Sequence, residues 1–423
     1  MNKPMKKLVE FCKSHRHIFC YGIGYYGKAL RAFLYEHEIK IDGYLTTQKS
    51  TNEKWDEIPI YDPRFLSNMP ENSGVIIGVS GRARDEIGGM LKKRGCEDIF
   101  SLSDEDLSCV EDQTNYFIEE IKYPAICVLY YHRICNLSLD TWRLAVSPNV
   151  FEEHIKWLKK KFQILSIEDD WAQVKRPSIV ITFDDGYADI FYEALPILEK
   201  YSVPATIFVS TGNIDQKMEF WWDMLEQIFF CNRNLPDIFS YGGNLFSLRT
   251  NNERKATCYA LHSCLKAMTS EERESTLREM ASLLQSQISF RDTHRVLTKN
   301  ELRKIDESPF VTIGGHTVSH PVLAVESILK QREEIEKSTE YLTRTLEHVI
   351  DVFSYPFGGV TDYTEETRKI ACECGYQKIV TTKFGLVKHD TNLMEIPRNW
   401  VPNDCSVKRL ERIIRKAWYY GRD

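Results

Sequence analysis

The sequence lacks several features that mark particular classes of protein. Its 423 residues contain no run of about 18 apolar residues, so no segment is expected to span a bilayer. Basic residues are not in excess, because 55 Lys and Arg against 61 Asp and Glu give a net charge of −6. This charge argues against a general nucleic-acid-binding protein. The composition, 43% hydrophobic and 27% charged, is typical of a soluble globular protein.

Signals for secretion and for cysteine chemistry are also missing. The amino-terminal segment lacks the uninterrupted apolar core of about 7 to 15 residues that a secretory signal requires. The 12 cysteines are scattered and include no Cys-x-x-Cys pair. Cys20 and Cys127 lie in apolar runs, where a thiol behaves as a small hydrophobic group. We therefore expect a cytoplasmic protein with reduced thiols, without a disulfide framework or a cysteine-based zinc site.

The length of the chain predicts two or three domains, at roughly 100 to 200 residues each. The pattern over residues 18–45 predicts a strand, a glycine-rich turn, a helix and a second strand, and 74–80 predicts a further strand. Residues 101–120 are acidic and suggest a linker. We place the first domain at 1–115 and the second at 116–423.

Three glycines in the first domain have the spacing of a dinucleotide-binding turn. In such a turn Gly22, Gly24 and Gly27 would let a phosphate approach the backbone amides at the start of a helix. The acidic residue expected at the end of the second strand is absent, and the nearest carboxylate, Asp42, lies at that strand's beginning. The same glycines suit a turn that only packs the helix on the strand, so both interpretations stay open.

The second domain has the residues of a metal site. An apolar strand over 178–183 runs directly into Asp184 and Asp185, and two adjacent carboxylates repel unless a cation or a shared proton relieves them. His316 and His320 follow another apolar strand and, four residues apart, can face one side. Two histidines and one carboxylate are a common ligand set for a catalytic divalent metal.

Three segments in this order, TFDDG, HTVSHP and FSYPFGG, resemble the principal motifs of the polysaccharide deacetylases, carbohydrate esterase family 4 with the NodB-homology fold. The similarity continues in LYYHRI, FWWDMLE and IPRNWV, and covers roughly residues 124–405. The first domain resembles the small Rossmann-like domain of bacterial sugar-modifying enzymes, which holds a nucleotide-sugar in some of them. We therefore expect an α/β protein: a distorted (β/α) barrel deacetylase domain preceded by a small Rossmann-like domain with a parallel sheet.

The resemblance implies a set of metal ligands. Asp185 corresponds to the carboxylate ligand, and His316 and His320 correspond to the imidazole ligands. The metal of the relatives is most often zinc, so we expect a divalent metal and name Zn²⁺. Such a cation polarises the acetyl carbonyl and lowers the pKa of a bound water from about 15.7 toward about 7.

The resemblance also implies catalytic and substrate-binding roles. Asp184 corresponds to the catalytic base and Arg398, in IPRNWV, to the arginine that fixes it. The backbone N–H of Phe357 corresponds to the amide that helps to bind the oxyanion. We place Tyr355 and Pro356 of the same segment among the substrate-binding residues.

One departure from the family concerns the proton donor. Many relatives carry a late histidine in a Leu-x-His motif that protonates the departing amine, and no histidine follows His389 here. His132, at the end of the first strand of the second domain, is our substitute candidate. The alternative is that His132 only satisfies a hydrogen bond of a turn.

Two further segments have open roles. Residues 213–305 form an insertion rich in helical patterns, and Trp222 near its start is either a platform for a sugar ring or part of a buried helix face. The segment 406–420 is a basic amphipathic helix. It either packs on the barrel or makes a peripheral contact with an anionic membrane.

These observations predict a metal-dependent carbohydrate deacetylase. Its expected substrate is an N-acetylated amino-sugar glycan, or the nucleotide- or lipid-linked precursor of one, in surface polysaccharide biosynthesis. The alternative is an inactive scaffold that binds a nucleotide-sugar or a glycan, but a site without turnover has no physical reason to keep Asp184 beside Asp185. A nicotinamide-dependent oxidoreductase would rest on the glycine-rich turn alone, and the ribose-binding acid is absent.

Overall fold

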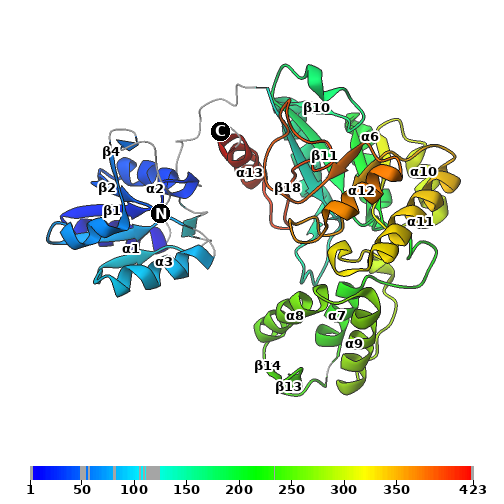
Figure 1. The fold of residues 1–423 in the computed structure, drawn as a ribbon, viewed down its shortest axis with the longest axis horizontal. Coiled ribbons are helices and arrows are strands. Elements are labelled where there is room, and N and C mark those ends of the chain that lie inside the picture. The colour runs from blue at the N-terminus through cyan, green and yellow to red at the C-terminus, as the bar shows by residue number, and fades with distance from the viewer. Residues whose placement is uncertain are drawn as a thin grey trace. The chain divides into compact units, whose positions relative to one another are not determined.

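The computed structural model of the chain describes residues 3–47, 54–55, 58–79, 82–103, 106–107, 110, 124–232 and 234–420. The chain divides into two compact units, Met1–Ile121 and Lys122–Gly421 (Figure 1). The predicted boundary between residues 115 and 116 lies outside the described residues.

The first unit is built on a six-stranded sheet with the order β3-β4-β2-β1-β5-β6. Neighbouring strands are parallel except β3 and β4, which are antiparallel. Without β3, the order is that of the doubly wound dinucleotide-binding folds, so the predicted parallel sheet is present. The strands are β1 (His17–Tyr21), β2 (Gly43–Leu45), β3 (Lys54–Trp55), β4 (Ile58–Tyr61), β5 (Ser73–Ile77) and β6 (Ile99–Ser101).

Side chains of β1 alternate between the two faces of this sheet, as the pleat of a strand requires. Ile18 and Cys20 pack in a core with residues of α1 (Lys3–Ser14) and α2 (Tyr25–Glu36). Phe19 and Tyr21 pack in a second core, which includes Leu91 of α3 (Arg82–Lys93). Both faces of the sheet are therefore covered.

The prediction of a linker at residues 101–120 is wrong for its first half. Leu102, Leu107 and Val110 are buried in the core beside α1 and α2. The acidic composition suggested an exposed linker, whereas the burial of these three apolar side chains places residues 102, 107 and 110 in the core. Residues 111–120 lie outside the described residues.

The glycine-rich turn has a packing role. Gly22 has a φ of 108°, and a Cβ on Gly27 would lie 1.9 Å from the carbonyl oxygen of Gly22. Gly24 is the N-cap residue of α2. Asp42 accepts a hydrogen bond from the backbone N–H of Ile18 at 2.8 Å, so it is engaged within the fold. Close packing accounts for Gly22 and Gly27, and the nucleotide-sugar site expected at this turn stays a prediction.

We expect Gly27→Ala to destabilise the first unit by about 1–3 kcal/mol, because its Cβ displaces backbone atoms. Gly89→Ala is the matched control, since Gly89 lies in α3 and its Cβ would meet nothing within 4 Å. That control should stabilise α3 by about 0.5–1 kcal/mol. Amide hydrogen exchange in β1 and α3 measures both effects, and equal stabilities of the two variants would contradict the packing role.

The second unit is a curled parallel sheet with the order β17-β16-β15-β12-β11-β7-β18, in which β10 also pairs with β11. Isolated bridges from Val380 to Ile396 and from Ile126 to Val387 join the segment before β18 to β17, at one end of the sheet, and to β7, next to the strand at the other end. The result is the predicted distorted barrel. The strands are β7 (Ile126–Tyr131), β10 (Gln163–Leu165), β11 (Ser178–Phe183), β12 (Ala205–Val209), β15 (Val311–Gly315), β16 (Val352–Ser354), β17 (Lys378–Val380) and β18 (Asn399–Trp400).

A largely helical insertion follows β12, and its elements lie together below the sheet in Figure 1. It contains α7 (Trp221–Phe230), α8 (Asn251–Lys266), α9 (Ser270–Leu283) and the hairpin of β13 (Ile238–Tyr241) and β14 (Asn244–Ser247). The helices agree with the prediction, whereas the hairpin was not predicted. Its turn contains Gly242 and Gly243, both with positive φ, which is a recognised signal for a two-residue hairpin.

The carboxyl-terminal helix α13 (Val407–Tyr420) packs on the barrel. Leu410, Ile414 and Ala417 are fully buried, and the helix contacts α5 (Pro148–Lys161), β7 and β18. The sequence left open whether this helix packs on the barrel or contacts a membrane, and in the structure it packs on the barrel. Within the described part of the chain, no helix is both long and apolar enough to cross a membrane.

Candidate active site

Residues that follow several of the parallel strands meet at one cavity of about 260 Å³. The carboxyl ends of parallel strands lie at one edge of a sheet, so side chains far apart in sequence meet there. The cavity includes the predicted residues His132, Asp184, Asp185, Trp222, His316, His320 and Phe357. It also includes Trp142, Leu144, Tyr259, His262 and Thr382, which the sequence did not indicate.

Asp185, His316 and His320 form a buried cluster at this cavity, and one ligand atom of each lies within 4.8 Å of the others. The Nε2 atoms of His316 and His320 lie 3.5 Å and 3.3 Å from Asp185 Oδ1. His316 Nδ1 lies 2.7 Å from the carbonyl oxygen of Ser354, and this contact orients the ring with Nε2 toward Asp185. Among the described residues, Asp185 Oδ1 and His316 Nε2 are buried without a hydrogen-bond partner. These donor atoms fit a divalent cation.

The protonation states of the cluster suit a metal. Burial opposes ionisation of Asp185, but the two imidazoles outweigh it and hold the pKa of this carboxyl well below its usual range. Burial lowers the pKa of His320 and is stronger there than the attraction of Asp185. An ionised carboxylate and a neutral imidazole are the forms that bind a metal.

Asp184 is held by Arg398 in a bidentate pair, with Nη1 and Nη2 each donating to one carboxylate oxygen at 2.7 Å. Arg398 also donates to the carbonyl oxygen of Thr381 and to the hydroxyls of Thr182 and Ser354. Burial raises the pKa of Asp184, but the charge and hydrogen bonds of Arg398 outweigh it and keep this pKa below its ordinary value. The pair therefore holds an oriented, ionised carboxylate at the cavity.

Four residues of the site have left-handed backbone conformations without being glycine. Their φ angles are 75° at Asp185, 64° at Thr317, 54° at His320 and 61° at Phe357. Such conformations cost roughly 1–3 kcal/mol each and gather where function constrains the backbone.

Phe357 follows β16 in a tight turn, and its ring lies 4.8 Å from that of His320. Among the described residues, its backbone N–H donates to no other group. Tyr355 is buried and stacks on Tyr363 with ring centroids 4.1 Å apart, and Pro356 is also buried. Neither Tyr355 nor Pro356 is among the described residues that line the cavity, so their substrate contacts stay a prediction.

The aromatic wall of the cavity is hydrogen-bonded. Trp222 is 5% exposed, and its Nε1–H donates to the hydroxyl of Tyr187 at 2.9 Å. That hydroxyl donates in turn to Asp223 at 2.7 Å. Trp142 Nε1–H donates to the carbonyl oxygen of Trp222 at 3.1 Å. Trp222 therefore lies on the buried face of α7 and also lines the cavity, and its role as a platform for a sugar ring stays a prediction.

Tyr259 and His262 are the residues that sequence reasoning missed most clearly. They lie three residues apart on α8, so both side chains fall on one face of the helix. That spacing was the only signal in the sequence, and it did not say what the face contacts.

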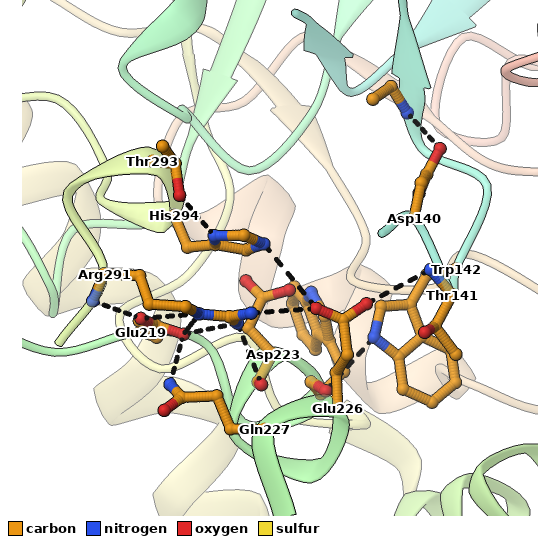
Figure 2. Close-up of polar contacts among 12 residues, drawn as sticks. Asp140, Thr141, Trp142, Glu219, Asp223, Glu226, Gln227, Arg291, Thr293 and His294 are labelled. Atoms are coloured by element: carbon orange, nitrogen blue, oxygen red, sulfur yellow. Dashed lines mark hydrogen bonds and ion pairs between the residues drawn. The ribbon is translucent and has the colours of Figure 1, made fainter. Parts of the chain in front are cut away.

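A buried polar network fixes α7, which carries Trp222. Figure 2 shows Arg291 between Glu219 and Glu226, with ion pairs of 2.7 Å and 2.9 Å. Glu226 also accepts a hydrogen bond from the backbone N–H of Thr141, beside Trp142 (Figure 2). Burial of Asp223 outweighs the attraction of nearby arginines and raises its pKa to about 8. The network connects the insertion to the segment after β7 and keeps both tryptophans in place.

Comparison with known proteins assigns the second unit to a family. Residues 172–231 and 244–379 match the family model described as polysaccharide deacetylase. The chain carries a polysaccharide deacetylase domain. Members of this family are hydrolases of N-acetyl groups that typically depend on a divalent metal, and the matched segments contain Asp184, Asp185, His316 and His320.

Individual relatives are distant. YxkH of Bacillus subtilis (strain 168), provisionally named a polysaccharide deacetylase, is 26% identical over 295 residues, which are 68% of this chain and 75% of YxkH. The poly-beta-1,6-N-acetyl-D-glucosamine N-deacetylase of Staphylococcus aureus (strain MSSA476) is 28% identical over 186 residues, 37% of this chain and 62% of the relative. The solved structure of Streptococcus pyogenes deacetylase PplD in complex with acetate is 21% identical, with a TM-score of 0.45, and the match covers 69% of this chain and 99% of PplD.

Proposed function

We propose that this protein is a divalent-metal-dependent deacetylase that hydrolyses the N-acetyl group of an amino-sugar glycan or of its nucleotide- or lipid-linked precursor. The observation that supports it is the buried cluster of Asp185, His316 and His320, whose unpartnered ligand atoms lie beside the ionised Asp184. Zn²⁺ is the metal we propose, because two imidazoles and one carboxylate are a common catalytic zinc site. The name of the Staphylococcus aureus relative supports an N-acetylglucosamine unit as the sugar.

The residues around the cluster have separate tasks in this reaction. A divalent metal held by the cluster supplies, when bound, a Lewis acid for the acetyl carbonyl and a more acidic water. Asp184, ionised and oriented by Arg398, accepts the proton of the attacking water. The backbone N–H of Phe357 donates to the oxyanion that develops on the acetyl group, a contribution of about 3–4 kcal/mol. Trp142 and Trp222 offer aromatic faces to the sugar ring.

The leaving amine needs a proton, and two histidines outside the metal cluster line the cavity, His132 and His262. Burial of His262, together with the charge of Lys266, lowers its pKa to about 4. Only on the order of 10⁻³ of His262 is then protonated at pH 7. His132 lies at the carboxyl end of β7, close enough to both carboxylates that its charge would stabilise them. We therefore propose that His132 donates the proton.

We expect His132→Gln to lower the rate of N-acetyl hydrolysis by about 10²–10⁴-fold, the usual effect of losing a general acid. Hydrolysis of an aryl acetate should fall far less, because a phenolate leaves without a proton. His262→Gln is the control, because it removes the other histidine that lines the cavity outside the metal cluster, and it should retain the ratio of the two activities. Acetate release from both substrates measures this ratio, and a selective loss of amide hydrolysis in His262→Gln alone would reverse the assignment.

Acetate release is also the experiment that tests the proposed function. We expect the zinc-loaded protein to release acetate from oligomers of N-acetylglucosamine or from the nucleotide- or lipid-linked sugar. Chelation should abolish this activity and added Zn²⁺ should restore it. Activity that survives complete removal of the metal would contradict the proposal, as would a metal-loaded protein that deacetylates none of the three substrates.

A further inference from the structure

A second cavity, of about 170 Å³, is lined in part by residues at the start of α7. Its wall includes Phe220 and Trp221, the residues before Trp222, and Val318 and Ser319, which lie between the two histidines of the metal cluster. Trp221 stacks on His262 of the catalytic cavity with ring centroids 4.8 Å apart. Each of these two stacked rings therefore lines one of the two cavities, which are neighbours.

Two hydrogen-bond donors at this second cavity lack acceptors. Arg273 of α9 is 3% exposed and Trp221 is 8% exposed, and both line the cavity. Arg273 Nη1 and Trp221 Nε1 are buried and have no hydrogen-bond partner among the described residues. The guanidinium lies over the Trp221 ring at 5.0 Å from its centroid, so the two side chains that carry these donors are neighbours. A buried donor without an acceptor costs about 1–3 kcal/mol, more when it is charged.

The carboxylates near Arg273 are engaged elsewhere. Glu219 lines the same cavity, but its oxygens accept from Arg291 and from Gln227, as Figure 2 shows. Glu274 pairs with Arg278 at 2.8 Å. Glu326 and Glu334 are near enough to stabilise the charge of Arg273, but no ion pair joins either of them to Arg273 among the described residues. Glu326 accepts from Ser270, and Glu334 accepts from the backbone N–H groups of Val318 and Ser319 and from the Ser319 hydroxyl.

We propose that Arg273 and Trp221 form a binding site for an oxyanion, a carboxylate or a phosphate, beside the catalytic cavity. A buried guanidinium with a free N–H and an adjacent indole N–H are donors without acceptors, and an oxyanion supplies both acceptors and a counter-charge. The hydroxyl of Ser270, which accepts from Arg273 Nη2 at 3.3 Å, completes the polar part of the site. The oxyanion is either carried by the substrate glycan or free in solution.

Calorimetry of inorganic phosphate binding to the full-length, metal-loaded protein tests whether the site takes an oxyanion that is free in solution. Arg273→Met should weaken this binding by about tenfold or more, the effect of losing a charged hydrogen bond. The matched control is Arg249→Met, which removes the same charge from an exposed position of the insertion. The same binding should survive Asp185→Asn, because a phosphate held by the catalytic metal would be lost with that metal.

Steady-state kinetics test whether the oxyanion is carried by the substrate. Of the two experiments, this one alone rests on the proposed function. Arg273→Met should raise the KM for an N-acetylated oligosaccharide with a carboxylate substituent at least tenfold and leave the KM for the neutral oligosaccharide unchanged. Trp221→Phe keeps an aromatic ring and loses the N–H donor. It should raise the same KM by about threefold or more, and it provides the test if Arg273→Met fails to fold. A loss in either arm supports the site and identifies the source. If Arg273→Met and Trp221→Phe match Arg249→Met in both arms, the proposal is overturned.

Discussion

Asp185→Asn should remove the bound metal and lower acetate release by at least about 10³-fold. Asp185 is the carboxylate of the cluster, and its Oδ1 lies nearest to the Nε2 atoms of both histidines. An amide oxygen in its place carries no negative charge to offset the cation, and loss of a Lewis acid costs several kcal/mol of barrier. Metal analysis of the purified variant, together with its acetate release, measures both effects.

The neighbouring variant Asp184→Asn is the matched control. It should retain about one metal per chain and still lose activity, because Asp184 is bound to Arg398 and is not part of the metal cluster. The two substitutions change adjacent residues in the same way, so a difference in metal content separates a ligand from a base. Full metal occupancy in Asp185→Asn, or loss of metal in Asp184→Asn alone, would exchange their roles.

We expect Arg398→Met to lower the free energy of unfolding of the metal-free protein by about 3–5 kcal/mol. The substitution leaves Asp184, whose side chain is 6% exposed, as a buried charge without its partner. Breaking a buried ion pair by removing one partner typically has this cost. Metal-free protein is the correct sample, since a bound cation would compensate the carboxylate. Chemical denaturation followed through the second unit gives the value.

Two further variants interpret that result. Arg332→Met removes an arginine from surface ion pairs with Glu336 and Glu373 and should cost less than about 1 kcal/mol. The double variant Asp184→Asn with Arg398→Met removes both charges and should recover part of the stability that Arg398→Met loses. If the double variant is as unstable as the sum of the two single ones, the pair is not energetically coupled.

The sequence predicted the parts of the site that lie next to strands. An apolar run that ends in Asp184 and Asp185 indicates a strand end, and parallel strands bring such ends together with the loop of His316 and His320. Arg398 came from the resemblance of IPRNWV to a family motif, because no spacing links it to Asp184, 214 residues away. The left-handed backbone at His320 could not be predicted, since a positive φ is uncommon at any single histidine even though histidine is enriched in this conformation.

The rest depended on how helices pack. Tyr259 and His262 reach the catalytic cavity only because α8 packs beside α7, and the periodicity of a helix gives its apolar face but not its neighbour. Arg273 is a similar case, because an arginine on a helix is usually exposed, whereas this one is buried over Trp221. Leu107 shows the reverse error. The acidic residues around it suggested an exposed linker, whereas its side chain is buried in the core of the first unit.

The pairing of β18 with β7 has a consequence for the order of synthesis. The first strand of the second unit, β7, pairs with its last strand, β18, and the residue just before β18 is Arg398. A growing chain therefore holds Asp184 without its counter-charge until more than two hundred further residues have emerged from the ribosome. The described residues of the first unit all precede β7 in the chain, so this unit can begin to fold before those residues are made. In the second unit, the base of the catalytic site and the closure of the barrel are completed by the same late segment.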